Sequence, residues 1–160
     1  MARAGPTKCE FRTIFHAPLP FAYAWCTDYT PDDPRLEDSS GSRKISRREK
    51  DRIFYEDLEE TPTGWMWSHW DVQLRPPNRW HGEGLGNYRR WSVDYSLKSL
   101  PKGRTEFRFK GRRWPMNLGT ASPPRARLER MLLQSWKKLG RVLEADYRRS
   151  LGRRGSRAKK

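Results

Sequence analysis

The sequence predicts an α+β fold, in which a curved seven-stranded antiparallel sheet wraps on one long C-terminal helix and two short helices follow the first strand. Three observations lead to this prediction. A short strand pattern runs directly into a compact apolar helical stretch. A long series of strand patterns and turn residues follows, and a single amphipathic helix closes the chain. One sheet and one helix must then cover each other, an arrangement that tends to leave a cavity between them.

The first strand is predicted over residues 7–15, where one side of the chain carries Cys9, Phe11, Thr13 and Phe15 and the other carries Glu10, Arg12 and Ile14. Pro18 and Pro20 end this extended run and suit the start of a helix, so we expect a first short helix over residues 21–26. A second short helix is predicted after Thr30, which precedes a proline and can cap it.

Six further strands are predicted over residues 43–49, 52–59, 65–75, 79–86, 88–97 and 105–113. Short runs of Pro, Gly, Asn and Asp separate them, and connections this short join antiparallel neighbours. The last two strands alternate most clearly, because Trp91, Val93 and Tyr95 share one face, as do Phe107 and Phe109. This pattern predicts a sheet with one solvated face and one covered face.

The final helix is predicted to be the cover. Its apolar residues recur in steps of three and four, at Leu128, Met131, Leu132, Trp136, Leu139, Val142, Leu143 and Tyr147. A helix of roughly 25 residues would be nearly 40 Å long, enough to cross a whole sheet. Gly140 lies in its middle, where it either permits close packing or introduces a slight bend.

Length and composition predict a single domain that can bury a core. The 160 residues are 34% hydrophobic and 12% aromatic and include eight Trp, which argues against general disorder. We expect a disordered N-terminus over residues 1–6, one domain over residues 7–151 and a basic disordered tail over residues 152–160.

The cysteines and the apolar segments bear on localisation. Cys9 and Cys26 lie far apart and have no zinc-site spacing, so we expect reduced thiols and a cytoplasmic protein. No stretch approaches the ~18 uninterrupted apolar residues of a membrane span. The N-terminal residues have no apolar core, so we do not expect a secretory signal.

The net charge of +15 is concentrated at the C-terminal end of the chain. Residues 123–160 contain thirteen Lys and Arg against three acidic residues, so their net charge is +10 and that of residues 1–122 is only +5. Such a segment attracts polyanions regardless of fold. A solubilising extension with no partner is the alternative interpretation.

The stretch from Phe15 to Asp28, which reads FHAPLPFAYAWCTD, resembles the opening pattern of the START-like (SRPBCC) superfamily: an apolar residue, a proline, a helix and a Thr-Asp pair. The order of predicted elements over residues 7–150 resembles the same superfamily. This resemblance implies a helix-grip fold with an apolar cavity between the sheet and the C-terminal helix. Members include polyketide cyclases, birch-pollen-allergen-like proteins and lipid-transfer domains, and others act as protein-binding modules.

A ligand site is predicted where the inward face of the sheet meets the helix. The candidate ligand-binding residues are Met66, Trp70, Val72, Trp91, Val93, Tyr95, Phe107, Phe109, Met131, Leu132 and Trp136. An aromatic cavity of this kind suits an apolar or aromatic molecule. The alternative is that these side chains meet one another and fill the core, since native packing density requires no void.

Three other groups of residues have functional interpretations. Trp65 and Trp67 are predicted to face outward, which indicates a partner or homodimer surface, unless neighbouring Arg side chains cover them in a monomer.

The glycines at positions 82, 84 and 86 share one face of a strand, and we interpret them as a bulged, bent strand rather than as space for a ligand.

His69, Asp71, His81 and Glu83 have the right types for a metal site or an acid–base pair. Spacing across a hairpin is easily matched by accident, so we interpret them as ordinary polar residues on a strand face.

The favoured function is binding of an apolar or aromatic small molecule, lipid-like or polyketide-like, in the predicted cavity. A cyclase or aromatase using residues such as His69, Glu83 or Asp94 is the first alternative. The second is a basic module that binds nucleic acid or an acidic protein through the tail and the cations near residues 43–52. The sequence has no nucleophile elbow, phosphate loop or metalloprotease helix, so we name no catalytic residue, metal or cofactor.

Overall fold

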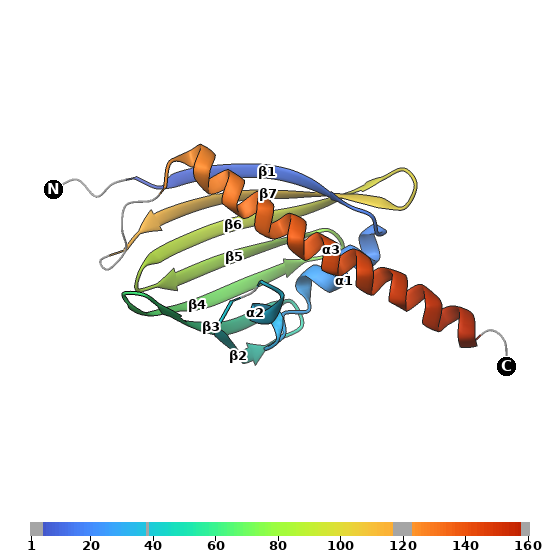
Figure 1. Ribbon diagram of the computed structural model, residues 1–160, viewed down its shortest axis with the longest axis horizontal. Coiled ribbons are helices and arrows are strands. Elements are labelled where there is room, and N and C mark those ends of the chain that lie inside the picture. Colours follow the sequence, from blue (N-terminus) through green and yellow to red (C-terminus); the bar gives the residue numbers. More distant parts are fainter. Residues whose placement is uncertain (1–4, 38, 117–122, 158–160) are drawn as a thin grey trace.

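The computed structural model describes residues 5–37, 39–116 and 123–157 (Figure 1). Its elements in chain order are β1 (Thr7–Phe15), α1 (Leu19–Thr27), α2 (Asp33–Leu36), β2 (Ser42–Arg48), β3 (Arg52–Thr61), β4 (Gly64–Arg75), β5 (Arg79–Gly86), β6 (Arg89–Leu100), β7 (Arg104–Pro115) and α3 (Arg125–Arg157). The predicted α+β class and the order of elements are confirmed.

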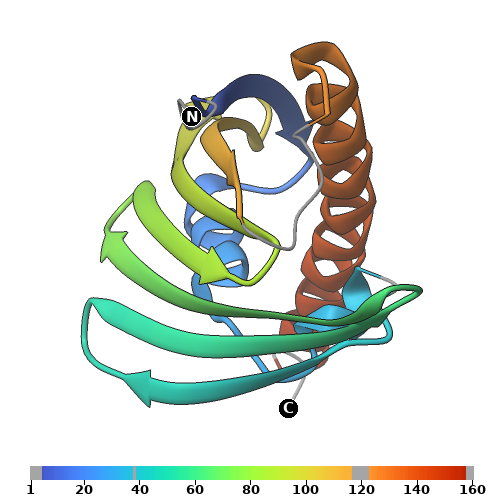
Figure 2. The ribbon, with the colours of Figure 1, turned by 90° about the vertical axis from the view of Figure 1, so that its left-hand side faces the viewer.

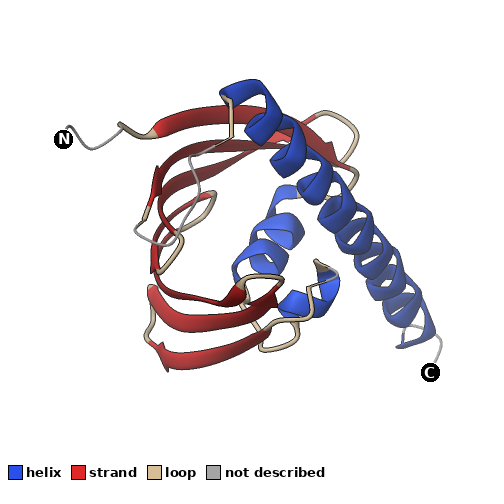
Figure 3. Ribbon diagram, turned by 60° about the vertical axis from the view of Figure 1, so that its left-hand side comes forward, coloured by secondary structure: helices blue, strands red, loops and turns tan. Residues whose placement is uncertain are grey.

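The strands form one antiparallel sheet in the order β1-β7-β6-β5-β4-β3-β2. From β2 to β7 each strand pairs with its neighbour in sequence, as expected for strands joined by short turns. The sheet curves around α3, with α1 and α2 across one end of the trough (Figures 2 and 3). The pairing of β2 with β3 shifts register between Ile45 and Arg47, whereas the other strand pairs are regular.

The hairpin between β6 and β7 extends these two strands further than the sequence pattern predicted. Lys102 and Gly103 both have positive φ angles, of 62° and 64°, in the turn that joins them. The loop has three residues, Pro101 to Gly103, a length common in hairpins when it includes left-handed backbone. The pairing therefore continues through polar residues up to Leu100 and Arg104.

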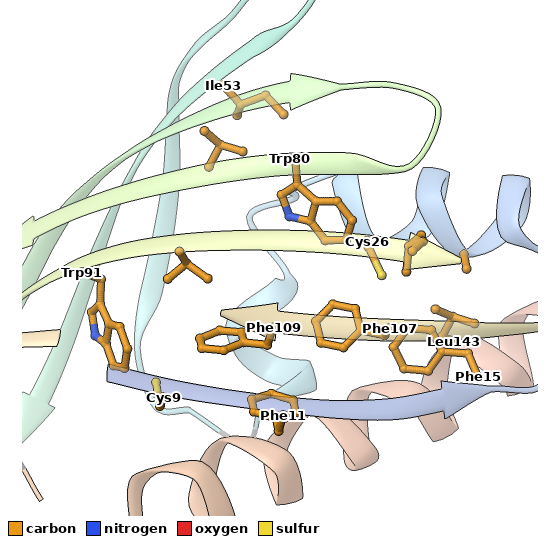
Figure 4. Close-up of a cluster of buried hydrophobic side chains, with 14 of the residues drawn as sticks. Cys9, Phe11, Phe15, Cys26, Ile53, Trp80, Trp91, Phe107, Phe109 and Leu143 are labelled. Carbon is orange, nitrogen blue, oxygen red and sulfur yellow. The ribbon is translucent and has the colours of Figure 1, made fainter. Parts of the chain in front are cut away.

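The buried core lies on the concave face of the sheet and is mainly aromatic (Figure 4). Phe11 of β1 stacks on Phe109 of β7 with ring centroids 4.9 Å apart, and Phe15 and Trp80 both contact the ring of Phe107. Along each strand these buried residues alternate with more exposed and mostly polar ones, because a period of two places successive side chains on opposite faces of a sheet.

Helix α3 lies diagonally across the concave face and packs mainly along β1 (Figure 1). A Cβ atom placed on Gly140 would lie 2.9 Å from two ring atoms of Phe15. Gly140 therefore serves close packing of α3 on β1, the first of the two roles considered for it. None of the described helices is long and apolar enough to cross a membrane.

The helix also runs further than expected. Residues 152–160 were predicted as a disordered tail, but residues 152–157 continue α3. Residues 158–160 lie outside the described part of the chain, as do residues 1–4 of the predicted N-terminal segment. The physical reason is that a helix already started by packing adds residues at little cost when no proline interrupts it, so α3 continues past the sheet despite two glycines in this stretch.

Candidate ligand-binding site

A cavity of about 350 Å³ lies between the concave face of the sheet and α3. Eight of the predicted site residues line it: Met66, Trp70, Trp91, Val93, Tyr95, Phe109, Leu132 and Trp136. They come from three strands and one helix, so the fold brings together residues up to 70 positions apart in the sequence. The side chains that were predicted to line this site therefore leave open space between the sheet and the helix, rather than filling it.

Three predicted site residues lie elsewhere. Val72 and Phe107 are buried in the core beside the cavity and do not line it. Met131 is 50% exposed and lies on the solvent side of α3, so its assignment to the ligand site was wrong. The reason is geometric, because Met131 and Leu132 are neighbours in sequence but their side chains point about 100° apart around a helix.

Trp70 forms much of one wall, and two glycines of β5 make room for it. A Cβ atom on Gly84 would lie 2.7 to 2.8 Å from three atoms of the indole ring, and one on Gly82 would lie 3.4 Å from it. The pairing of β4 with β5 has no register shift, so the bulge expected at these glycines is absent from this strand pair. The missing side chains instead let the ring lie across β5.

Two neighbours fix the position of this ring. The indole Nε1 of Trp70 donates a hydrogen bond to Ser68 Oγ at 3.1 Å. On its other side the ring stacks on Tyr55, with centroids 6.0 Å apart and planes 11° from parallel. The wall is therefore held by packing and by one hydrogen bond to a side chain of the same strand.

Arg43 of β2 supplies a buried charge that was not predicted at this site. Its side chain is only 8% exposed, and its Nε and Nη2 donate to the two carboxylate oxygens of Asp57 at 2.8 and 2.9 Å. Its Nη1 donates to Asp33 at 2.7 Å, and the guanidinium lies 4.2 Å from the centroid of the Tyr55 ring. The prediction had grouped Arg43 with cations available to polyanions, which is wrong because two carboxylates engage it.

Other cations of that group are also engaged. Arg48 donates to the main-chain oxygens of Asp28 and Tyr29, and Arg52 forms a bidentate pair with Asp71. Each of these contacts fixes the arginine to the surface of its own domain.

Tyr55 and Tyr95 place phenol groups at the cavity. Burial raises the pKa of both hydroxyls, and for Tyr95 the nearby Glu37 raises it further. Both phenols therefore remain protonated at neutral pH and can donate hydrogen bonds. Within the described part of the chain neither hydroxyl takes part in a hydrogen bond, so both are available to a bound molecule.

One part of the cavity lining is charged. Arg89 forms it together with Glu37 and Glu59. Burial lowers the pKa of the Arg89 guanidinium, and the carboxylates of Glu59, Glu37 and Asp57 oppose that effect. Among the residues that the structure describes, Arg89 makes no ion pair within 4.0 Å, so its charge is balanced only at longer range. The cavity thus has an aromatic body and a polar end.

The histidine and acidic residues considered for metal binding or catalysis lie on the convex face, away from the cavity. His81 Nδ1 and Nε2 are each 2.8 Å from a carboxylate oxygen, of Asp94 and Glu83 respectively, while His69 lies near Glu56. The described residues contain no group of three His, Cys, Asp or Glu that could hold a metal ion. His69, Glu83 and Asp94 were therefore misplaced as candidates for chemistry inside the cavity.

The outward orientation predicted for two tryptophans agrees with their exposure. Trp65 is 56% exposed and Trp67 is 40% exposed, and Leu58 and Leu85 lie beside them on the convex face. A dimer through this surface remains a prediction.

Comparison with known proteins supports the fold. No family model matches the sequence, and no curated protein is significantly similar to it. Among solved structures, the Zhui aromatase/cyclase from Streptomyces sp. R1128 superposes with a TM-score of 0.70 at 11% identity, over 91% of this chain and 96% of that chain.

Two further structures extend the likeness. A START superfamily protein from Mycobacterium smegmatis matches with a TM-score of 0.67 at 11% identity, over 91% of this chain and 99% of that one. Ara h 8.0201 matches with a TM-score of 0.64 at 9% identity, over 89% and 98%. The protein therefore has a START-like helix-grip fold, which confirms the predicted fold.

Proposed function

We propose that this protein binds an apolar or aromatic small molecule, lipid-like or polyketide-like, in the cavity between the sheet and α3. The observation that carries the proposal is the open space of about 350 Å³ beside a densely packed aromatic core. Pockets of this size, lined by aromatic side chains with a few polar groups, are typical of small-molecule sites. The likeness to an aromatase/cyclase and to a START protein adds support from the fold alone.

Two neighbouring positions of α3 allow a matched test. Leu132 lines the cavity, whereas Met131 is exposed. We expect Leu132→Trp to fill the cavity and to weaken binding of palmitate or a flavonoid at least tenfold, which corresponds to about 1.4 kcal/mol. Met131→Trp adds a similar ring outside the cavity and should leave the affinity unchanged.

Binding is measured by native mass spectrometry of the purified protein and by titration followed through tryptophan fluorescence. Equal effects of the two substitutions would refute the cavity as the binding site. Failure of both compounds to bind the unmodified protein would count against the proposed ligand class.

The charged end of the cavity favours a ligand that also carries an acidic group. A carboxylate near Arg89 would gain a charge-assisted hydrogen bond in a partly desolvated place. We expect Arg89→Gln to weaken binding of palmitate much more than binding of its methyl ester, since only the acid has a charge to lose. Equal losses for the two compounds would mean that Arg89 acts through packing instead.

A cyclase- or aromatase-type reaction in the same cavity is the second candidate, favoured by the two protonated phenols. A phenol O–H that donates a hydrogen bond to a carbonyl oxygen can stabilise the negative charge that develops there during enolisation or ring closure. We expect Tyr95→Phe to abolish turnover of a poly-β-ketone analogue while retaining its binding. Turnover that persists unchanged in this variant would exclude Tyr95 as the proton donor.

A further inference from the structure

The solvent face of α3 carries a row of cations on the side away from the cavity. Its members are Arg127, Arg130, Lys137, Arg141 and Arg148, all exposed and spaced by three, seven, four and seven residues. At about 100° per residue these positions fall within roughly a quarter of the helix circumference, and at ~1.5 Å per residue they span about 32 Å. We refer to these five residues as the cationic stripe.

The acidic residues of α3 are all turned toward the body of the protein. Glu129 Oε1 accepts a hydrogen bond from the main-chain N–H of Glu10 at 2.8 Å, and Glu144 Oε1 accepts one from the N–H of His16 at 2.8 Å. Asp146 Oδ2 accepts from Trp25 Nε1 at 2.9 Å. Residues 123–160 contain no other carboxylate, so the fold itself removes negative charge from the outward face of the helix.

The stripe residues also lack local partners. In the described residues none of the five takes part in an ion pair, in contrast to Arg125, which pairs with Glu129, and Arg149, which pairs with Asp146. An uncompensated row of charges on a rigid helix raises the electrostatic potential along its whole length. Such a surface is suited to a polyanion whose charges are also regularly arranged.

We propose that the cationic stripe binds the phosphate backbone of a double-stranded nucleic acid. A duplex carries one negative charge per ~1.7 Å of axis, so a rod of about 32 Å can neutralise several phosphates at once. Within the sector of the helix that the stripe occupies, the other residues between Arg127 and Arg148 are only Gln134 and Ala145, and the exposed Met131 and Leu151 lie outside it on opposite sides, so they form no continuous apolar face. A helix that binds a membrane surface needs an apolar face toward the acyl chains, so the composition favours a nucleic acid over a lipid surface.

The far end of α3 is accessible to such a partner. The helix continues past the edge of the sheet (Figure 1), and its contacts with the rest of the protein include Tyr147 against Phe21 of α1. Leu132 and Trp136, which line the cavity, belong to the opposite side of the helix. The proposed contact is therefore separate from the proposed small-molecule site and does not depend on it.

The number of cations predicts the salt dependence of binding. Neutralising about five phosphates gives a slope of log K against log salt concentration of about −4.5, so affinity should fall about 500-fold between about 50 and about 200 mM salt. Because the contacts are to the backbone, affinity should vary little with base sequence.

The test uses the full chain and a fluorescently labelled mixed-sequence DNA duplex of about two helical turns, with anisotropy measured over a salt series. The variant R130Q/K137Q/R141Q removes three stripe cations at exposed positions and should make the slope shallower by about 2.7. The control K50Q/K98Q/K102Q makes the same change in net charge at exposed positions outside α3 and should leave the slope nearly unchanged. Circular dichroism confirms that both variants keep their helix content.

Each alternative result has a definite meaning. Equal losses in the two triple variants would show that net charge and not the stripe attracts the duplex, and would overturn the proposal. Absence of duplex binding to the unmodified protein at about 50 mM salt would also overturn it. So would binding to vesicles containing phosphatidylserine that depends on the stripe when duplex binding does not, because the partner would then be a membrane.

Discussion

At the scale of single residues, two glycines of β5 differ by less than 1 Å in how closely a Cβ atom on each would approach Trp70, which forms the wall of the cavity. A Cβ atom at position 82 would make an ordinary 3.4 Å contact with the ring of Trp70, whereas one at position 84 would lie 2.7 Å from it. We expect Gly84→Ala to destabilise the protein by about 1–3 kcal/mol through overpacking, and Gly82→Ala to cost less than about 0.5 kcal/mol. Urea unfolding measures both.

The comparison of these two variants separates the effect of Trp70 from the general effect of a glycine in a strand. If both substitutions have the same effect, the loss reflects glycine in a strand in general and not the position of Trp70. A larger effect at position 84 should come with a change in tryptophan fluorescence, because the displaced ring must move into the cavity.

His81 predicts a pH dependence on the convex face. Partial burial lowers the pKa of this imidazole, but its hydrogen bonds with Asp94 and Glu83 outweigh that effect and the net shift is upward. A raised pKa in the folded state means that the charged histidine stabilises the fold below its unfolded pKa of about 6.5, and that this contribution is lost as the pH rises through the folded pKa.

We therefore expect the stability difference between the unmodified protein and His81→Asn to be larger at about pH 5.5 than at about pH 8.5. Urea unfolding at the two pH values measures it, and NMR titration of the imidazole gives the pKa directly. Asp94→Asn should lower that pKa. A stability difference that grows with pH would contradict the assignment.

The sequence predicted the aromatic part of the site and missed its charged part, for reasons that belong to single residues. Trp91 and Tyr95 could be placed because strand alternation assigns each residue to a face. Arg43 could not, since an arginine in a charged strand normally lies at the surface. Its burial depends on Asp33 and Asp57, which reach it only through the fold.

At the scale of elements, the contact between α3 and β1 depends on the absence of a side chain at Gly140. We expect Gly140→Leu to destabilise the protein by about 2 kcal/mol or more, because the added side chain would overlap the buried ring of Phe15 and force the helix away from the sheet. Arg141→Leu places the same side chain on the exposed face and should change stability by less than about 0.5 kcal/mol.

Thermal and urea unfolding of the two variants measure this difference. Gly140→Leu gains helix propensity of about 0.8 kcal/mol relative to glycine, so a stabilised variant would show that Phe15 can move aside and that the close approach is not required.

Elements could be predicted well wherever periodicity is strong, and less well at their ends. The apolar steps of α3 identified the helix and its buried side, but not where it stops. No apolar residue marks the end of the helix after Leu151, so composition alone suggested disorder there. The extra turns arise from propagation of a helix that packing has already nucleated.

At the scale of the whole molecule, α3 separates two proposed sites by presenting one side to the cavity and the opposite side to solvent. We expect saturation of the cavity with palmitate to change the duplex affinity less than about twofold, since no residue is shared between the sites and reciprocal coupling requires a change that both ligands sense. Anisotropy titration of the duplex with and without palmitate measures it. A change of tenfold or more would mean that a bound ligand moves α3.

The overall fold could be predicted because its constraints are global and few. One sheet with a single apolar face and one amphipathic helix have essentially one way to bury both surfaces. The same reasoning predicted a cavity but left a filled core as an alternative, because the balance between filled and unfilled space depends on how Trp70 lies across β5. The position of the Trp70 ring follows from the register in which β4 pairs with β5. The alternation of side chains along each strand does not determine that register.

The open sheet has one further consequence. A strand at the edge of a sheet exposes unpaired main-chain groups that can recruit another strand and start aggregation. Here Glu129 of α3 occupies the edge N–H group of Glu10 in β1 and Glu144 occupies that of His16, directly after β1, while β2 carries three exposed cations and an irregular register at the opposite edge. Carboxylates of α3 thus oppose strand addition at one edge and exposed charge opposes it at the other, which is the protection that an unclosed sheet around a cavity needs.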